Sequence, residues 1–272
     1  MHKVIKARTG AARLNLAELW EFRELIYFLA WRDILVRYKQ TVIGVLWALV
    51  RPFVTIVVFT IVFGRFARVP SGSIPYPVLA LAGLIAWQLF STAFSESSSS
   101  VVGNSQLVSK VYFPRLIMPL SAIVSSLADF VVTLAMLAML MLWYRVPVSP
   151  TVAWLPLFLL LCLIIALGSG IWFAALYVRY RDIRHLIPFI VQLGLYISPV
   201  GFPSSIVPER WRFLYSLNPM AGVIDGFRWS LFGGRNPIYM PGLALSIVLS
   251  IAILISGAYY FRNTERLFAD II

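Results

Sequence analysis

Long apolar segments alternate with short polar ones along most of this 272-residue chain. A helix needs about 20 mainly apolar residues to cross a bilayer. Six segments meet that requirement, at 41–64, 78–95, 116–143, 152–177, 186–204 and 238–261. The pattern therefore predicts an all-α integral membrane protein with a six-span transmembrane domain over residues 41–262, flanked by an N-terminal part at 1–40 and a short tail at 263–272.

The N-terminal part contains a predicted helix, from Asn15 to Lys39, that lies on the membrane surface. Asn15 followed by Glu18 is a variant of the capping box, which starts helices. Trp20 and Trp31 suit the level of the lipid headgroups. A soluble amphipathic helix is the alternative. Apolar residues are spread around this helix rather than gathered in one stripe, which weakens both interpretations.

The segment 205–237, between the fifth and sixth candidate spans, is too apolar for a loop in water and too interrupted to span. Asn218 and Pro219 favour a helix start, and Gly233 and Gly234 favour a stop. A helix of about 14 residues is too short to cross the bilayer. The sequence therefore predicts short re-entrant helices here, with an amphipathic surface hairpin as the alternative.

Composition supports the membrane assignment, because 60% hydrophobic and 12% charged residues do not suit a water-soluble globule. The net charge of +12 is distributed unevenly. With both termini on one side, the segments on that side hold 15 Lys and Arg residues and those on the other side hold seven. The positive-inside rule therefore predicts that both termini are cytoplasmic. The same distribution explains the basic charge without a nucleic-acid partner.

The residues for catalysis are sparse. The chain has two histidines and one cysteine, Cys162, which predicts no disulfide and no metal site, and Cys162 is expected to pack among apolar side chains. The run Gly168–Gly170 lacks the spacing of a nucleophile elbow and is typical of close helix packing. No lysine stands in a phosphate-binding loop. We therefore expect no catalytic residue and no cofactor on this chain, so that any ATP hydrolysis belongs to another subunit.

Two ionisable residues fall within the candidate spans, where a charge is costly. Arg51 in the first span can snorkel to the headgroups. Asp129, near the middle of the third, is too short to do so, and is predicted to face a partner, a cavity or water, or to be protonated. An Arg51–Asp129 ion pair is one option that the sequence leaves open. Gln88 and Gln192 are weaker markers, more typical of interhelical hydrogen bonds than of ligand contacts.

Several motifs follow one another along the chain: Gly44-Val45-Leu46-Trp47 with Arg51-Pro52, the run Asn104–Lys110 with Phe113-Pro114-Arg115, Tyr180-Arg181-Asp182, and Leu217-Asn218-Pro219-Met220. In these motifs the chain resembles the membrane (permease) subunit of polysaccharide-exporting ABC transporters. The resemblance implies a homodimer with two separate ATPase subunits, which bind ATP and Mg. It also implies export of a lipid-linked glycan across the bacterial cytoplasmic (inner) membrane, with O antigen foremost and capsule or teichoic acid as others.

The same resemblance implies a coupling helix in the segment 96–113 that docks on the ATPase. The docking residues expected from it are Asn104, Leu107, Lys110, Arg181 and Asp182. For the alternative functions, a proton-coupled secondary transporter would use Asp129 as a relay, and a membrane enzyme would act on lipid-linked sugars. Export would stop without a partner ATPase only if the protein is half of an ATP-driven exporter.

Aromatic side chains are candidates for the glycan pathway, because sugars pack their apolar C–H faces on aromatic rings. Trp87, Phe90 and Phe94 recur at three and four residues, which places them on one helical face. Tyr196 lies midway along the fifth span. Arg51 and Asp129 are predicted to stand beside the pathway and hold hydroxyls or the pyrophosphate of the lipid. Ordinary packing, or an aromatic belt at the membrane interface, is the competing interpretation.

Overall fold

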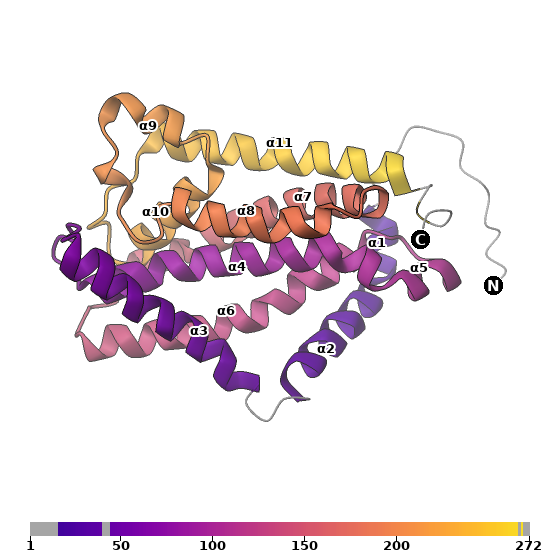
Figure 1. Cartoon of the computed structure of the whole chain (residues 1–272), viewed down its shortest axis with the longest axis horizontal. Coiled ribbons are helices and arrows are strands. Elements are labelled where there is room, and N and C mark those ends of the chain that lie inside the picture. Colours follow the sequence, from indigo (N-terminus) through magenta and orange to yellow (C-terminus); the bar gives the residue numbers. More distant parts are fainter. Residues whose placement is uncertain (1–15, 40–43, 266–267, 269–272) are drawn as a thin grey trace.

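The computed structural model describes residues 16–39, 44–265 and 268, and every regular element within them is helical. The α-helices and the shorter 3-10 and π segments (η) are shown in Figure 1 and have these bounds: α1 Leu16–Glu21, α2 Arg23–Lys39, α3 Gly44–Phe59, η1 Thr60–Phe66, α4 Tyr76–Gly103, α5 Ser105–Lys110, α6 Ile117–Trp143, η2 Pro150–Trp154, α7 Leu155–Arg179, α8 Ile183–Ile197, η3 Ser204–Ile206, α9 Glu209–Tyr215, α10 Pro219–Leu231 and α11 Met240–Thr264.

The long helices lie side by side along one axis of the molecule (Figure 1). One end, called the α5 end, carries α1, α5, the turn between α7 and α8, and the last turn of α11. The opposite end, called the α9 end, carries α9, α10 and the connection from η1 to α4. The helices α4, α6, α7, α8 and α11 run between the two ends, while α2 slopes toward the start of α3.

Helix α4 is the central element, because α3, α6, α7, α8 and α10 all contact it. Small residues allow the backbones around it to approach closely. A Cβ atom added to Gly170 of α7 would lie 2.6 Å from Cβ of Ser97, and one added to Gly168 would lie 2.7 Å from Cα of Leu254 on α11. The predicted packing role of Gly168–Gly170 is thus confirmed. Cys162, on the same helix, is fully buried.

Within the described residues, five helical segments are long and apolar enough to cross a membrane: Ala48–Phe66, Tyr76–Gly103, Ile117–Trp143, Pro150–Arg179 and Met240–Thr264. They correspond to five of the six predicted spans. The remaining candidate, 186–204, is the 15-residue helix α8. At 1.5 Å per residue it is about 22 Å long, short of the roughly 30 Å of hydrocarbon. It ends at Ile197 because Ser198 is extended, the conformation favoured before Pro199.

The predicted polar gap that begins at Glu96 is wrong at its start, because α4 continues through the serine run to Gly103. Serine is compatible with a helix when its hydroxyl donates to a carbonyl three or four residues back. The Ser99 Oγ donates to the Ser95 carbonyl at 2.9 Å, and the Ser100 Oγ donates to the Ser97 carbonyl at 2.7 Å. The gap therefore shrinks to α5 and the residues that lead into α6.

The N-terminal helix is divided into α1 and α2 by a turn at Phe22. The predicted cap, Asn15, lies outside the described residues. Helix α2 packs along α6, and Trp20 of α1 and Trp31 of α2 are 70% and 49% exposed. Exposed rings on both sides of the turn suit a helix at a membrane surface.

The segment at the α9 end forms short helices, as predicted. Helix α10 begins at Pro219, and the Asn218 side chain caps it by accepting from the Met220 N–H at 3.0 Å. After α10, Gly233 and Gly234 adopt left-handed backbone with φ values of +68° and +75°. This conformation is easy for glycine, which explains why the helix stops there.

Candidate functional site

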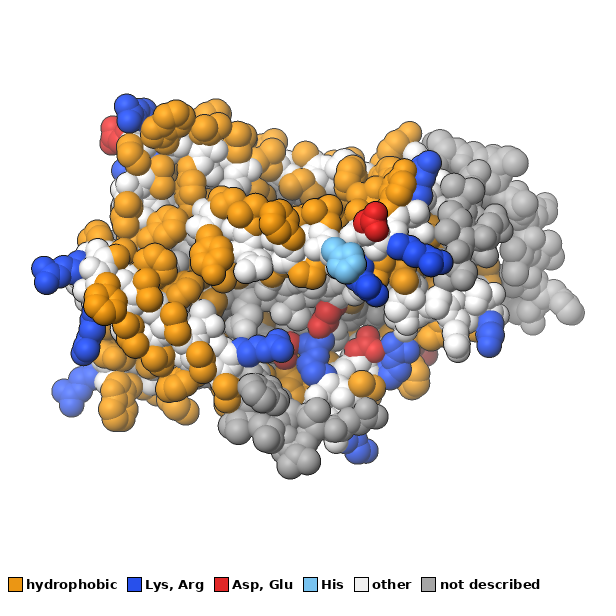
Figure 2. Space-filling view, in the orientation of Figure 1, with side chains coloured by type: hydrophobic (Ala, Val, Ile, Leu, Met, Phe, Trp, Pro, Cys, Tyr) orange, Lys and Arg blue, Asp and Glu red, His pale blue; other side chains and the backbone are white. Residues whose placement is uncertain are grey.

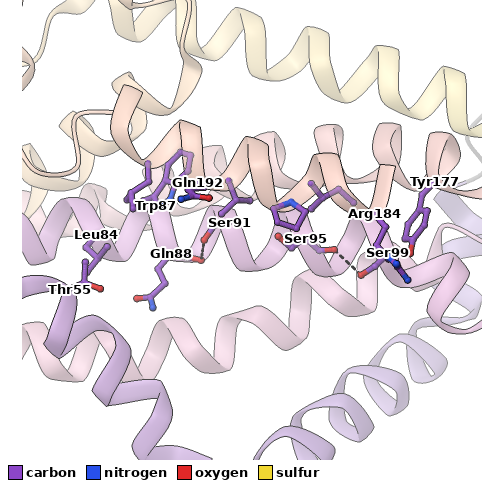
Figure 3. Close-up of a pocket in the computed structure, with 14 residues that line it drawn as sticks. Thr55, Leu84, Trp87, Gln88, Ser91, Ser95, Ser99, Tyr177, Arg184 and Gln192 are labelled. Atoms are coloured by element: carbon purple, nitrogen blue, oxygen red, sulfur yellow. Dashed lines mark hydrogen bonds between the residues drawn. The ribbon is translucent and has the colours of Figure 1, made fainter. Parts of the chain in front are cut away.

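A groove of about 540 Å³ runs along α4, with α3 on one side and α8 on the other (Figure 3). Its most regular feature is a row of hydroxyls from Ser91, Ser95 and Ser99, which are four residues apart and so lie on one face of α4. Thr55 of α3 and Gln192 of α8 add polar groups from the two sides. The groove is therefore a polar strip within an apolar bundle.

The groove is elongated rather than round. From Leu84 to Ser99 its floor extends over 15 residue steps of α4, or about 22 Å at 1.5 Å per residue. Arg184 lies over Ser99 at the end nearer α5 (Figure 3). The Oε1 atom of Gln88, another lining residue, is buried with no hydrogen-bond partner in the described part of the chain. Buried polar atoms normally have partners, so this unpaired oxygen is an exception among the described residues.

The surface around the groove is mostly hydrophobic (Figure 2). On α3 the side chains of Phe53, Val54 and Val58 are about half exposed, and on α8 those of Phe189 and Leu193 are as well. Contiguous apolar surface of this kind needs lipid or another protein to cover it. The polar groove thus opens on a face that water alone does not solvate.

The structure divides the predicted aromatic pathway residues into two groups. Trp87 lines the groove, and Tyr196 is 63% exposed on α8. Phe90 and Phe94 are buried and stacked on each other with ring centroids 5.7 Å apart. Phe94 also meets Phe173 of α7 edge to face at 5.2 Å. Packing accounts for these two phenylalanines inside a single chain, and a pathway role stays a prediction for all four.

Asp129 has a charged partner, and that partner is Arg37 of α2. The Arg37 guanidinium donates to Asp129 of α6 and to Glu96 of α4, and the Tyr38 hydroxyl also donates to Asp129. The Arg51–Asp129 pair that the sequence left open does not form, because both carboxylate oxygens of Asp129 are engaged by α2. Arg51 lies exposed on α3. Figure 2 shows acidic and basic side chains meeting in a hollow between α4 and α2.

The electrostatics of this cluster favour internal pairing. Burial and the hydrogen bond to Asp129 raise the pKa of Tyr38, which keeps its hydroxyl protonated as a donor. Burial opposes the charge on Arg37, but Glu96 and Asp129 outweigh it, and the pKa of Arg37 is raised. Because Arg37 is shared by two carboxylates, the cluster fastens α2 to α4 and α6 and does not present a cation to an anionic ligand.

The predicted ATPase-docking residues all lie at the α5 end. Lys110, Arg181 and Asp182 are exposed, and Leu107 is partly buried on α5. Asn104 is used within the chain: its Oδ1 accepts from the Arg32 Nη2 at 3.0 Å and its Nδ2 donates to the Ser100 carbonyl at 2.9 Å. The structure thus gives α5 and the α7–α8 turn one common surface, with Asn104 joining α4 to α5.

Arg228 of α10, at the α9 end, is completely buried. It donates to the backbone carbonyls of Leu79 at 3.2 Å, Val200 at 2.7 Å and Phe202 at 2.8 Å. Burial lowers the pKa of Arg228 to about 10, so the side chain remains charged at neutral pH. In the sequence it counts only as one of the basic residues of an outer segment.

These elements define a multi-pass membrane protein with a long polar groove, a class suited to moving a substrate rather than to transforming one. The ABC-2 type transporter family matches residues 24–232 of the chain, and the chain belongs to that family. It is a transporter and not an enzyme, as predicted.

The relatives of the chain match it over almost its whole length. An O-antigen export system permease protein, RfbA of Klebsiella pneumoniae, is 26% identical over 270 residues, which cover 96% of this chain and 98% of the relative. Its counterpart from Myxococcus xanthus is 29% identical over 258 residues, or 94% and 98% of the two chains. The polysialic acid transport protein KpsM of Escherichia coli is 24% identical over 242 residues, or 86% and 91%.

Several residues of the site did not emerge from the sequence. Arg37 and Glu96 were hidden because one lies in the surface helix and the other at a predicted gap, so neither counted as an intramembrane charge. The serine row was visible in principle: Ser91, Ser95 and Ser99 recur every four residues, which marks one polar face on an otherwise apolar helix. That periodicity is the signal that could have located the groove.

Proposed function

We propose that this chain is the membrane-spanning subunit of an ATP-driven exporter that moves a lipid-linked polysaccharide, O antigen foremost, across the cytoplasmic membrane. The observation that carries the proposal is the serine-lined groove along α4, in a chain whose relatives include O-antigen export permeases. A polysaccharide offers many hydroxyls in a row, and a row of serine hydroxyls at regular spacing gives each one a weak partner. Weak, repeated contacts let a polymer slide.

The pathway forms between two copies of the chain. In the most apolar part of Ala48–Phe66, which combines α3 and η1, only 17% of the residues are buried inside one copy. This side of the groove therefore has surface left for a partner. Two grooves facing each other would enclose a polar channel, while the apolar faces outside meet lipid. The lipid tail of the substrate stays in the bilayer, and exposed Arg51 and Arg184 are placed to receive its phosphates.

The ATPase subunits bind at the α5 end. This end has the exposed α7–α8 turn and the short helix α5, and neither is large enough to carry out catalysis. Replacing Leu107 with Asp should weaken ATPase association, or uncouple hydrolysis from export, without preventing membrane insertion. Pull-down of the ATPase from detergent-solubilised membranes checks this, and full assembly with full export would count against the docking site.

The α5 end faces the cytoplasm, and six helices cross the membrane: α3, α4, α6, α7, α8 and α11. The excess of basic residues supports this orientation. Helix α8 completes its crossing with residues 198–202, and α9 and α10 dip into the outer leaflet. On a background without Cys162, cysteines at Ser71 and Ser205 should be labelled from outside intact cells. Outside labelling at Ser109 would reverse the topology.

Filling the groove tests the export function directly. Ser95→Trp places an indole across the serine row and should reduce glycan export per assembled complex at least about tenfold, a barrier of about 1.4 kcal/mol, while the complex still hydrolyses ATP. Ser256→Trp, at an exposed position of α11, is the matched control and should export normally. Equal export by the two variants would contradict the pathway. Export that persists without the ATPase would instead favour the proton-coupled carrier.

A further inference from the structure

Helix α8 is fastened by side-chain hydrogen bonds at one end and by apolar contacts alone at the other. We propose that the segment 197–202, called the outer anchor, fixes the outer end of α8 to α4 and α10, so that the groove widens only at its α5 end when α8 tilts. Arg228 is the main positioning residue of this hinge. The inference rests on the proposed function, because it concerns how the same groove is regulated.

The first part of the outer anchor is the Arg228 fork. Two of its three acceptors, Val200 and Phe202, belong to the anchor, and the third, Leu79, lies in the first turn of α4. A guanidinium has donors in a fixed planar fork, so one side chain sets the relative positions of three backbone segments. Because Arg228 is fully buried, water cannot replace these bonds without opening the bundle.

Three more side chains hold the same short segment. The Tyr76 hydroxyl donates to the Gly201 carbonyl at 2.6 Å, and the Tyr215 hydroxyl donates to the Ile197 carbonyl at 2.9 Å. The Asn218 Nδ2 donates to the Ser198 Oγ at 2.9 Å. Together with Arg228, these donors come from α4, α9, α10 and the residue that caps α10. Five bonds within six residues make the outer anchor the most heavily fastened part of the path between α8 and α9.

The opposite half of α8 has no comparable fastening. Its contacts there are apolar: Ile187 is buried, and Ile183 and Ile190 pack against the hydrophobic core. No side-chain hydrogen bond joins residues 183–196 to another helix within the part of the chain that the structure describes. Pro188 also removes one backbone hydrogen bond from this half. Closer to the anchor, Gly194 lies against Trp87, where an added Cβ would lie 2.4 Å from the ring.

Because α8 is fixed at its outer end, a small tilt of this helix moves its other end by several ångströms. With its outer end fixed, a 15-residue helix about 22 Å long moves its free end by about 4 Å for a tilt of about 10°. The free end carries Arg184 and joins the exposed turn at Arg181 and Asp182, which lies on the proposed ATPase side. A push on that turn therefore opens the groove beside Ser99 and leaves its outer end at constant width.

Hydrogen exchange on the assembled complex with its ATPase measures the two ends separately. Residues 198–202 should exchange slowly, and residues 184–193 faster, because opening free energies follow local contacts. Binding of a non-hydrolysable ATP analogue should change exchange only in residues 184–193.

A variant tests the anchor itself. Tyr76→Phe removes one anchor bond and should raise exchange in 198–202 about tenfold. Tyr144→Phe, whose hydroxyl lies at the same end outside the anchor, is the control. Uniform exchange along 184–202, or a nucleotide effect centred on 198–202, would overturn the hinge.

The second experiment measures glycan export and ATP hydrolysis by the same complex. Arg228→Lys keeps the charge but loses the fork, so α8 should shift as a whole when pushed, and glycan exported per ATP hydrolysed should fall at least about fivefold with ATPase activity retained. Arg210→Lys, on the exposed face of α9, should leave that ratio unchanged. If Arg228→Lys does not assemble, the double variant Tyr76→Phe/Tyr215→Phe takes its place. An unchanged ratio in a variant with a loosened anchor would overturn the proposal. A wild-type complex that hydrolyses ATP and exports no glycan would instead refute the proposed function, and the exchange pattern would still test the hinge.

Discussion

Helices α3 and α4 are both apolar enough to cross a membrane, yet they differ completely in surroundings. In their most apolar windows, 17% of the residues are buried in α3 with η1 and 78% in α4. Helix α3 with η1 is rich in Val, Ile and Phe, whereas α4 is richer in Ala and Ser. In a bilayer, helices gain no hydrophobic energy from leaving lipid, so close packing of small residues decides which helix becomes the centre.

The comparison also explains where the polar groups are placed. Ser91, Ser99 and Ser100 donate to carbonyls of α4 itself, and Ser91, Ser95 and Ser99 line the groove, while α3 exposes mostly hydrocarbon. Helix α3 is thus a weakly packed side of the groove, and α4 is its firmly packed base. Substitutions in the two helices should therefore have unequal consequences for stability.

The largest loss of stability is expected for a substitution at Gly83 of α4. A Cβ there would lie 2.6 Å from Arg228 Nη2 and 2.8 Å from the Val200 carbonyl. Gly83→Leu should both overpack the bundle and displace a buried charge, a loss of about 4 kcal/mol or more. The yield of folded protein in detergent should collapse. Val58→Leu on exposed α3 should leave the yield unchanged, and equal yields would break the comparison.

A smaller difference is expected between two phenylalanines. Phe94 is 1% exposed and packs on Phe90 and Phe173, whereas Phe53 of α3 is 59% exposed. Phe94→Ala should leave a cavity and cost about 3 kcal/mol, seen as a lower thermal unfolding temperature in detergent. Phe53→Ala should shift that temperature little. A loss of export from Phe94→Ala without any loss of stability would show that the pathway, and not packing, explains this residue.

The smallest effect is expected at Ser98. Its Oγ is buried with no hydrogen-bond partner in the described residues. Ser98→Ala removes a polar atom that gains nothing from burial, so the unfolding temperature should stay equal or rise slightly, by less than the equivalent of about 1 kcal/mol. Ser100→Ala, which loses the 2.7 Å bond to the Ser97 carbonyl, is the comparison within the same helix. A clear drop at Ser98 alone would indicate a partner in the assembled transporter.

Much of the fold could be predicted from hydrophobic length alone, because five of the predicted spans are long and mainly apolar. The cap at Asn218 and the stop at Gly233 were also predictable, since both depend on local backbone chemistry. The end of α4 was not: a run of serines is as typical of a loop as of a packed helix, and only the surrounding helices decide between them. The early end of α8 was not predictable, because apolar residues continue after Pro199.

The candidate site was less accessible to sequence reasoning. That Asp129 needs a partner followed from its depth, but its partner is 92 residues away on a helix assigned to the surface. The spacing of Trp87, Phe90 and Phe94 placed them on one face of α4. It did not show that Phe94 contacts α7 while Trp87 lines the groove. Such choices depend on the positions of several helices together, which no single segment encodes.

The burial of Arg228 has a consequence for how the chain is made. An arginine at the centre of a membrane helix costs about 3 kcal/mol on insertion scales, so α10 gains from finding its acceptors already in place. All three acceptors, in Leu79, Val200 and Phe202, precede Arg228 in the chain and leave the ribosome first. Synthesis from the N-terminus therefore delivers the carbonyls before the guanidinium that needs them. Nascent chains stalled after α10 should already protect this region from protease, and chains stalled before it should leave residues 198–202 open to cleavage.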